Sequence, residues 1–122
     1  MTNFKGTREA FAAALMDMAE ERKDIVVLSP DSLKAMRAVA FGDKYPERYV
    51  ECGIAEQCSV DAAAGLASAG LTPFVGTYCG FLTMRACEQM RTFVGYTDLN
   101  VKFVGVNAGL LGGEREGVTH QF

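Results

Sequence analysis

The chain has 122 residues, of which 49% are hydrophobic and 22% are charged, a composition that suits one soluble domain around a single core. Its formal net charge is -3, and no cluster of Lys and Arg is present. Phosphate binding needs a concentrated basic face, so nucleic-acid and membrane partners are excluded. No apolar run matches a signal peptide or a membrane span, and we therefore expect a cytoplasmic protein.

The first half of the chain predicts two helices and two strands. Residues 7–23 repeat apolar side chains at helical spacing, with Thr7 as the expected N-cap. Residues 25–28 form a short apolar run that is typical of a strand buried on both faces. A second helix is predicted over residues 31–41, and a short strand over residues 48–51.

The second half continues the alternation. Residues 55–69 are rich in Ala and contain Gly65, which predicts a helix lying close against another backbone and ending at Gly70. Residues 72–76 are the next predicted strand. Residues 81–93 are predicted as one helix.

On that helix Arg85, Glu88 and Arg91 stand three apart and are expected to pair along one face. A buried strand over residues 100–106 and a Gly-rich loop over residues 107–117 follow. The whole chain therefore predicts a single α/β domain over residues 1–122, a doubly wound, mostly parallel sheet with helices on both faces. Because it stops at Phe122, soon after the Gly-rich loop, we expect the fold to be truncated at its C-terminus.

The cysteines at positions 52, 58, 79 and 87 show neither the paired spacing of a zinc site nor the density of a secreted disulfide scaffold. We expect reduced, mostly buried thiols with no metal role.

Several candidate site residues follow predicted strands, where ligands of open parallel sheets bind. Asp31 comes after the first strand, Glu56 opens the Ala-rich helix, and Tyr78 and Phe81 follow the third strand. Glu56 suits either a helix start or a ligand, because a helix N-terminus favours a carboxylate. The two aromatic rings suit either a core or the stacking of a flat heterocycle.

Two further candidates lie near the ends of the chain. Arg8 can hold an anion or stand as a solvated arginine, and His120, the single histidine, can belong to a site or to the surface. The glycines of the 107–117 loop match no nucleotide-binding fingerprint, so a phosphate cradle is not supported there.

Taken together, these segments resemble the central, pyrimidine-binding domain of transketolases, most of all the C-terminal subunits of split transketolases. The resemblance runs in order along nearly the whole chain. Its specific blocks are Gly-Ile-Ala-Glu-Gln at residues 53–57 and Thr-His-Gln at residues 119–121. The latter, beside Arg-Ala-Cys-Glu-Gln at residues 85–89, fits a transketolase better than a 2-oxo-acid dehydrogenase subunit.

The resemblance implies thiamine diphosphate as cofactor and gives each candidate a role. Glu56 matches the glutamate that hydrogen-bonds the aminopyrimidine ring and activates the cofactor. Tyr78 and Phe81 match aromatic residues that enclose that ring, and Asp31 matches an acid near the thiazolium side. In the family, residues matching His120 and Arg8 act on the sugar substrate, the histidine by direct contact and the arginine by holding a phosphate.

Three positions depart from the family pattern. Asn107 stands in place of a histidine that helps to hold the donor phosphate, and Glu116 replaces an aspartate that reads a substrate hydroxyl. Met84 stands where transketolases often place a third ring-contacting tyrosine and where deoxyxylulose-phosphate synthases place an arginine, which argues mildly against the synthase activity. A sugar without a standard phosphate end is therefore a possible substrate.

The Gly-Asp-Gly motif that holds the diphosphate in this family does not occur in the sequence. We therefore expect a diphosphate-binding partner subunit to hold the diphosphate and its Mg²⁺ or Ca²⁺, with no metal bound by this chain and with catalysis only in a homo- or hetero-oligomer such as a dimer. The predicted reaction is transfer of a two-carbon ketol unit from a ketose to an aldose. The alternatives are a deoxyxylulose-phosphate synthase-like subunit, a 2-oxo-acid dehydrogenase β-type subunit and a non-catalytic interaction module.

Overall fold

The computed structural model describes residues 6–109 and residue 120. Within them, four parallel strands form one sheet in the order β2-β1-β3-β4. The strands are β1 (Ile25–Ser29), β2 (Tyr49–Glu51), β3 (Thr72–Tyr78) and β4 (Lys102–Val106). The chain leaves β1 for β2 on one side and then crosses to β3 on the other, so the predicted doubly wound, parallel α/β fold is confirmed.

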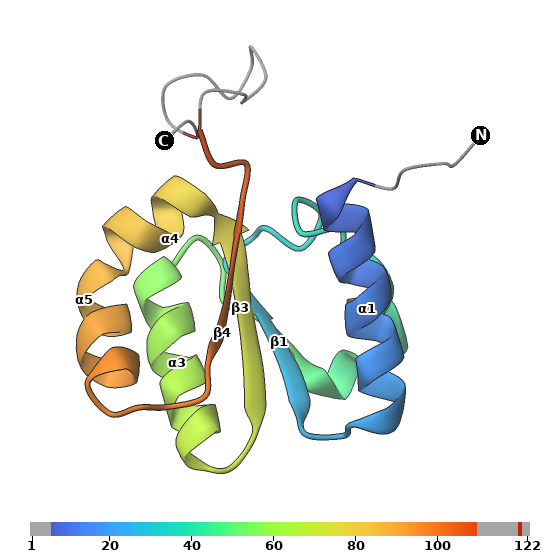
Figure 1. Ribbon diagram of the computed structural model, residues 1–122, viewed down its shortest axis with the longest axis horizontal. Helices are drawn as coiled ribbons and strands as arrows, with labels where there is room; N and C mark the ends of the chain where they lie inside the picture. The colour runs from blue at the N-terminus through green and yellow to red at the C-terminus, as the bar shows by residue number, and fades with distance from the viewer. Residues whose placement is uncertain (1–5, 110–119, 121–122) are drawn as a thin grey trace.

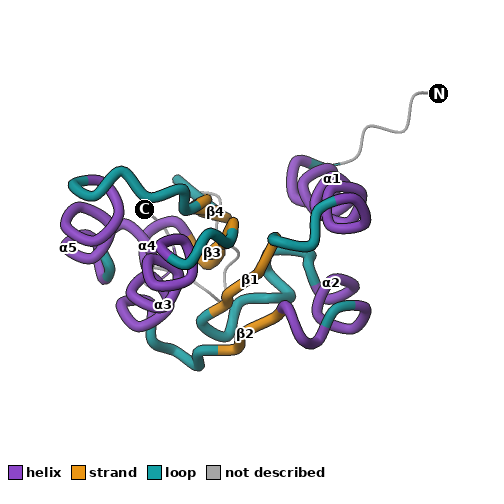
Figure 2. The backbone as a smooth tube through the Cα atoms, turned by 90° about the horizontal axis from the view of Figure 1, so that it is seen from below, coloured by secondary structure: helices purple, strands orange, loops and turns teal. Residues whose placement is uncertain are grey.

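Helices cover both faces of this sheet, as Figures 1 and 2 show. On one face lie α1 (Thr7–Glu21) and α2 (Val39–Lys44). On the other lie α3 (Glu56–Ser68), α4 (Cys79–Arg85) and the single turn α5 (Cys87–Gln89). A 3₁₀ turn, η1 (Pro46–Arg48), precedes β2, and a π-helical segment, η2 (Met90–Gly95), follows α5. No helix in the described part of the chain has the length and apolar character needed to cross a bilayer.

The alternation of side chains along β1 divides the core into two layers. Ile25 and Val27 pack with Leu15 and Phe41 beneath α1 and α2. The intervening strand residues pack on the opposite face with α3, α4 and η2, in a cluster of Val26, Leu28, Val60, Ala63, Ala64, Val75, Leu82, Ala86 and Val94. All five residues of β1 are buried, which confirms the prediction of a strand covered on both faces.

The helix predicted over residues 31–41 is wrong in its first part, because α2 begins only at Val39. The preceding segment is a series of turns in which Asp31 and Arg37 adopt left-handed backbone angles, with φ of 52° and 61°. These angles interrupt a helix. They let Met36 reach the core, where it is fully buried against β3 at Gly76.

The single helix predicted over residues 81–93 is also wrong. It begins earlier, at Cys79, and breaks at Ala86, where φ is -108° and ψ is 19°. Ala86 is fully buried, and beyond it the chain continues as α5 and the π-helical η2. The break removes the common helix face on which Arg85 and Glu88 were expected to meet.

Of the two predictions made for glycines of the Ala-rich segment, one is confirmed and one is wrong. Gly70 has φ of 89° and ends α3 as predicted, with its N–H and that of Leu71 bonded back to Ala67 and Leu66. Gly65 is not packed against a backbone, because no atom lies within 4 Å of the place where its Cβ would stand. It faces a surface hollow of about 340 Å³ beside Phe93 instead.

Two smaller expectations also need correction. Thr7 is the first residue of α1, while the N-cap position belongs to Gly6, and no side chain caps this end. All four cysteines are free, as expected, but they are not mostly buried: Cys58 and Cys87 are exposed, and Cys52 and Cys79 are partly exposed.

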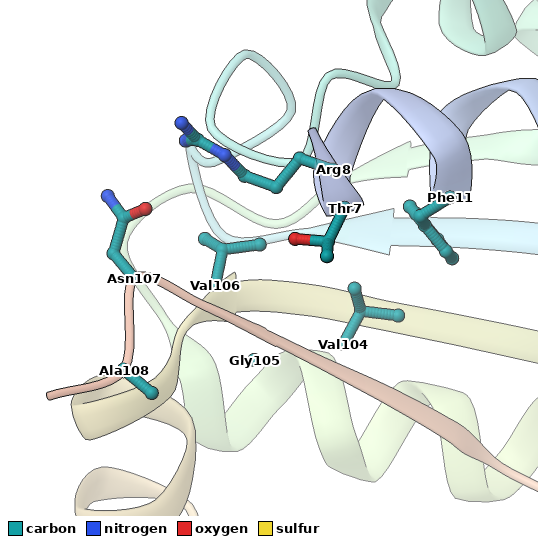
Figure 3. A pocket seen from close by; sticks show the side chains of 8 residues that line it. All are labelled: Thr7, Arg8, Phe11, Val104, Gly105, Val106, Asn107 and Ala108. Atoms are coloured by element: carbon teal, nitrogen blue, oxygen red, sulfur yellow. The ribbon is translucent and has the colours of Figure 1, made fainter. Parts of the chain in front are cut away.

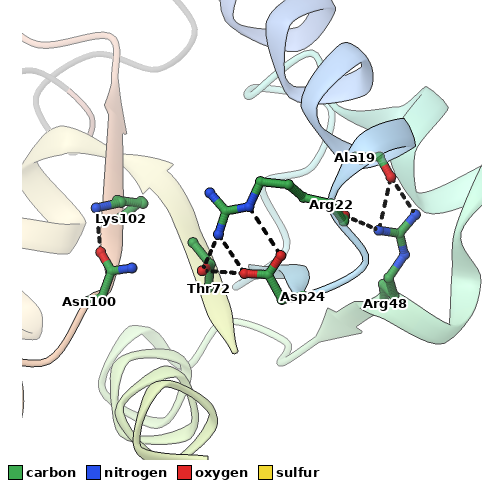
Figure 4. A network of polar contacts seen from close by, with 7 residues as sticks. All are labelled: Ala19, Arg22, Asp24, Arg48, Thr72, Asn100 and Lys102. Carbon is green, nitrogen blue, oxygen red and sulfur yellow. Dashed lines mark hydrogen bonds and ion pairs between the residues drawn. The ribbon is translucent and has the colours of Figure 1, made fainter. Parts of the chain in front are cut away.

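Polar side chains hold the amino-terminal edge of the sheet together (Figure 4). Arg22 donates to both carboxylate oxygens of Asp24, at 2.5 and 3.1 Å, and Thr72 donates to Asp24 at 2.7 Å. These bonds lower the pKa of Asp24 to about 2. Nearby, the buried Arg48 donates to the carbonyl oxygens of Ala19 and Arg22 at 3.0 to 3.2 Å, and so closes the end of α1.

Candidate active site

The carboxyl-terminal edge of the sheet carries the predicted site residues. In register, Ser29 pairs with Glu51 and Tyr78 pairs with Val106, so the loops that follow these strands open on the same edge. The N-termini of α1, α3 and α4 lie at this edge as well (Figure 1). The residues do not form one group there. They fall into three neighbourhoods, around Glu56, around Arg8 and around Asp31.

Glu56 is the first residue of α3, and the N-cap position before it belongs to Ala55. The residue is only 4% exposed, and its Oε1 accepts a hydrogen bond from Nη1 of Arg85 at 2.8 Å. An ordinary helix-start glutamate would project into water or bond to its own first turn. The burial of this carboxylate therefore needs an explanation other than helix capping.

Arg85 makes a second contact on the same side of α4. Its guanidinium carbon lies 3.8 Å from the ring centroid of Phe81, one helical turn earlier. The arginine side chain is 45% exposed, so one end of this ion pair reaches solvent while the other does not. We expected Arg85 to pair with Glu88, but Glu88 forms its ion pair with Arg91, at 3.2 Å.

Three rings gather beside this pair. The ring of Tyr78 lies 5.7 Å from that of Phe81, and the ring of His120 lies 4.5 Å from Tyr78 and 4.8 Å from Phe81. The structure thus brings together four residues that were singled out from the sequence, together with Arg85. The result is a buried carboxylate next to aromatic faces, an arrangement that suits a flat heterocycle with an N–H donor.

Arg8 and Asn107 line a different hollow, of about 500 Å³, between the start of α1 and the end of β4. Figure 3 shows both polar side chains at one side of this hollow, and Phe11 and Val104 at the other. Arg8 also donates to the carbonyl oxygen of Ala35 at 3.3 Å. The hollow therefore offers a cation and an amide above an apolar wall, while Glu116 lies outside the described residues.

Asp31 stands apart from both groups, next to Glu51 at the end of β2. The Glu51 carboxylate accepts the backbone N–H groups of Asp31 and Gly53, both at 2.8 Å, and the hydroxyl of Tyr49. Burial alone would raise the pKa of Glu51, but these hydrogen bonds outweigh it and hold that pKa below its usual value. Burial and the Glu51 carboxylate together raise the pKa of Tyr49.

Glu51 was not recognised from the sequence. It joins the turn after β1 to the loop that leads into Glu56, and it holds Asp31 and Gly53 at positive φ angles of 52° and 64°. A carboxylate directly before a Cys-Gly turn is a weak signal, because acidic residues are common at strand ends. The role of Arg85 had a better signal, since it stands four residues after Phe81 on one helix.

Comparison with known protein families identifies the family to which this chain belongs. Residues 5–122 match the family described as transketolase, pyrimidine binding domain. The chain belongs to this transketolase family. The resemblance found in the sequence is thereby confirmed, and this is a thiamine-diphosphate-dependent enzyme family.

Individual transketolase relatives agree with this. The chain is 36% identical over 118 residues to one subunit of the apulose-4-phosphate transketolase of Phocaeicola vulgatus, covering 97% of this chain and 38% of the relative. It is 42% identical over 110 residues to the 1-deoxy-D-xylulose-5-phosphate synthase of Rhodococcus jostii, covering 90% of this chain and 16% of that protein. This transketolase domain therefore spans well under half the length of these relatives.

Solved transketolase structures share the fold. A split-gene transketolase, described as an inactive β4 tetramer, superposes with a TM-score of 0.78 at 39% identity, over 94% of this chain and 36% of that one. The transketolase of Pichia stipitis superposes with a TM-score of 0.81 at 22% identity, over 95% of this chain and 19% of that one. The second match concerns the fold alone.

Proposed function

We propose that this chain is the pyrimidine-binding half of a thiamine-diphosphate-dependent transketolase, which transfers a two-carbon ketol unit from a ketose to an aldose together with a diphosphate-binding partner chain. The observation that carries the proposal is the Glu56 carboxylate, which is 4% exposed, accepts a hydrogen bond from Arg85 and lies in a cluster with Arg85 and Phe81. The relative from Phocaeicola vulgatus is one subunit of its transketolase, which supports a division of labour between two chains.

The residues present fit the pyrimidine end of the cofactor. A buried carboxylate is an acceptor for a ring N–H, and the rings of Tyr78 and Phe81, 5.7 Å apart, provide faces for a flat heterocycle. When bound, thiamine diphosphate supplies a nucleophilic carbon that the side chains of the protein lack. Glu56 would hold a proton at the pyrimidine ring nitrogen, and Tyr78 and Phe81 would orient the ring and exclude water.

The remaining candidates would serve the substrate and the far side of the cofactor. His120, in contact with both rings, would contact the reacting sugar, and Arg8 with Asn107 would hold its anionic or polar end in the 500 Å³ hollow. We further propose that Glu116 reads a sugar hydroxyl and that Asp31 lies toward the thiazolium side.

The metal and the diphosphate are assigned to the partner chain. Across residues 6–109 and 120, no three His, Cys, Asp or Glu side chains come close enough to hold a metal ion. Two exposed apolar side chains, Ile54 at 74% and Met84 at 63%, adjoin the Glu56 and Arg85 positions in sequence. Such side chains favour an interface with another protein chain over permanent contact with water.

Reconstitution tests the proposal. The chain is produced alone and together with a chain that carries a Gly-Asp-Gly diphosphate-binding motif, and aldose formation from a ketose donor is measured. We expect activity only in the complex, and no tight binding of Mg²⁺ and thiamine diphosphate by the isolated chain in calorimetry. Tight binding by this chain alone would contradict the half-site, and turnover of a 2-oxo acid in place of a ketose would favour the synthase-like or dehydrogenase-type alternatives.

A further inference from the structure

Arg85 makes two contacts with residues of the candidate site at the same time. Its Nη1 donates to the buried Oε1 of Glu56 at 2.8 Å, and its guanidinium lies over the face of Phe81 at 3.8 Å. A guanidinium is flat, cationic and rich in N–H donors, and it stacks on aromatic rings. It therefore presents the same features as a protonated aminopyrimidine, namely a planar face for Phe81 and an N–H for Glu56.

We propose that Arg85 is a placeholder, a side chain of this protein that occupies the pyrimidine position of the site and must be displaced when the ring binds. The proposal rests on the proposed function, because it takes an aminopyrimidine as the ligand. Beyond that function, it proposes that Arg85 on α4 competes with the pyrimidine ring for Glu56 and Phe81.

The exposures of the two partners indicate which one moves. The Glu56 side chain is 4% exposed and lies at the start of a helix packed on the sheet, so it has little freedom. The Arg85 side chain is 45% exposed and stands at the last residue of α4, from which its long stem can turn into water. Release of the arginine leaves the carboxylate and the face of Phe81 open to the ring.

The effect on affinity is expected to be modest. Each ring that binds must replace two contacts of Arg85: its ion pair with Glu56 and its stacking on Phe81. Together these correspond to about a tenfold loss of affinity. The Arg91–Glu88 pair is the natural comparison. It has the same residue types on the following turns, but its side chains are 73% and 63% exposed, so it holds no buried carboxylate.

The experiment is a titration of the whole 122-residue chain with 4-amino-2-methylpyrimidine, followed by NMR. Three chains are compared: the natural one, Arg85→Ala, and Arg91→Ala as a control with the same change in charge. We expect Arg85→Ala to bind the pyrimidine about tenfold more tightly and Arg91→Ala to bind like the natural chain. In the natural chain, the side-chain Nε–H signal of Arg85 should move toward that of a solvated arginine as the site fills.

A second variant covers the case in which Arg85→Ala fails to fold because Glu56 is left without a partner. Arg85→Lys keeps the positive charge but has no planar group to stack on Phe81, so it should also bind the pyrimidine more tightly than the natural chain. Equal or weaker binding by the Arg85 variants would overturn the placeholder and leave the proposed function standing. If none of the chains bound the pyrimidine, the placeholder would be overturned, whereas the proposed function would still be decided by the reconstitution with the diphosphate-binding chain.

Discussion

The two edges of the sheet use the same residue types to different ends. At the amino-terminal edge, the Arg22–Asp24 pair is completed by Thr72, and the buried Arg48 donates to carbonyl oxygens of the chain. At the carboxyl-terminal edge, Glu56 is buried but its partner Arg85 is half exposed. An arginine and a carboxylate therefore close the fold at one edge and leave an exchangeable contact at the other. The two arginines are similarly exposed, Arg22 at 51% and Arg85 at 45%, so the pairs differ in their carboxylates: Asp24 is 34% exposed and also accepts from Thr72, whereas Glu56 is 4% exposed.

The largest effect is expected at the carboxyl-terminal edge. In the complex with a diphosphate-binding chain, Glu56→Gln keeps the size of the side chain but removes the negative charge, so ketol transfer should fall by about two to three orders of magnitude. The first turnover at saturating cofactor is measured, so that weak cofactor binding is not mistaken for slow chemistry. Glu88→Gln, on the exposed pair, is the control and should keep the natural rate. An unchanged rate in Glu56→Gln would reduce Glu56 to a structural residue.

At the amino-terminal edge, Arg48→Ala should reduce the free energy of unfolding by about 2–4 kcal/mol, because it removes the buried guanidinium that donates to the carbonyl oxygens of Ala19 and Arg22 at the end of α1. The pyrimidine affinity of the folded fraction should not change. Urea unfolding measures the first quantity and NMR titration the second. If Arg48→Ala lowered affinity while leaving stability intact, the division between the two edges would be lost.

The same substitution, Gly→Ala, should have opposite effects on stability at two positions away from the sheet edges. A Cβ at Gly76 would lie 2.2 Å from Cε of the buried Met36, so Gly76→Ala should destabilise the fold by about 1–3 kcal/mol. A Cβ at Gly65 meets no atom within 4 Å, so Gly65→Ala should stabilise α3 by about 0.5–1 kcal/mol. Thermal unfolding of both variants tests the pair, and opposite signs are required.

The smallest effect concerns pH. The pKa of Asp24 is lowered to about 2 by hydrogen bonds from Arg22 and Thr72. Because the folded pKa is depressed, its contribution to stability is fully present above about pH 4 and is lost as the pH falls toward 2. Asp24→Asn should flatten the acid limb of the unfolding curve within that window. An acid limb identical to that of the natural chain would show that Asp24 does not control it.

The spacing of apolar residues and the residues that end helices and strands predicted most of the fold. The apolar run at residues 25–28, the Ala-rich helix and the stop at Gly70 are local signals, and each was confirmed. The segment from Asp31 to Ala38 was missed because its shape depends on distant partners. Glu51 fixes its start, and space at Gly76 admits Met36.

The candidate site followed the same rule. Sequence blocks pointed to Glu56, Tyr78, Phe81 and His120, and the structure brings these residues together. Spacing placed Arg85 one helical turn after Phe81, but the helix break at Ala86, which separates Arg85 from Glu88, had no local signal in the sequence. Because tertiary packing decides such breaks, the partner of Glu56 could not be read from spacing alone.

The cluster around Glu56 has a consequence for inheritance. Glu56, Phe81 and Arg85 come from α3 and α4, which are joined only by β3, so a single continuous stretch of gene encodes them. The hollow at Arg8 and Asn107 joins α1 to the end of β4, and its parts lie on either side of that stretch. A recombination event that carries the α3–β3–α4 unit moves Glu56, Phe81 and Arg85 together, and leaves His120 and the hollow with the recipient. The residues that would bind the pyrimidine on this stretch can thus be inherited as one unit, separately from Arg8 and Asn107.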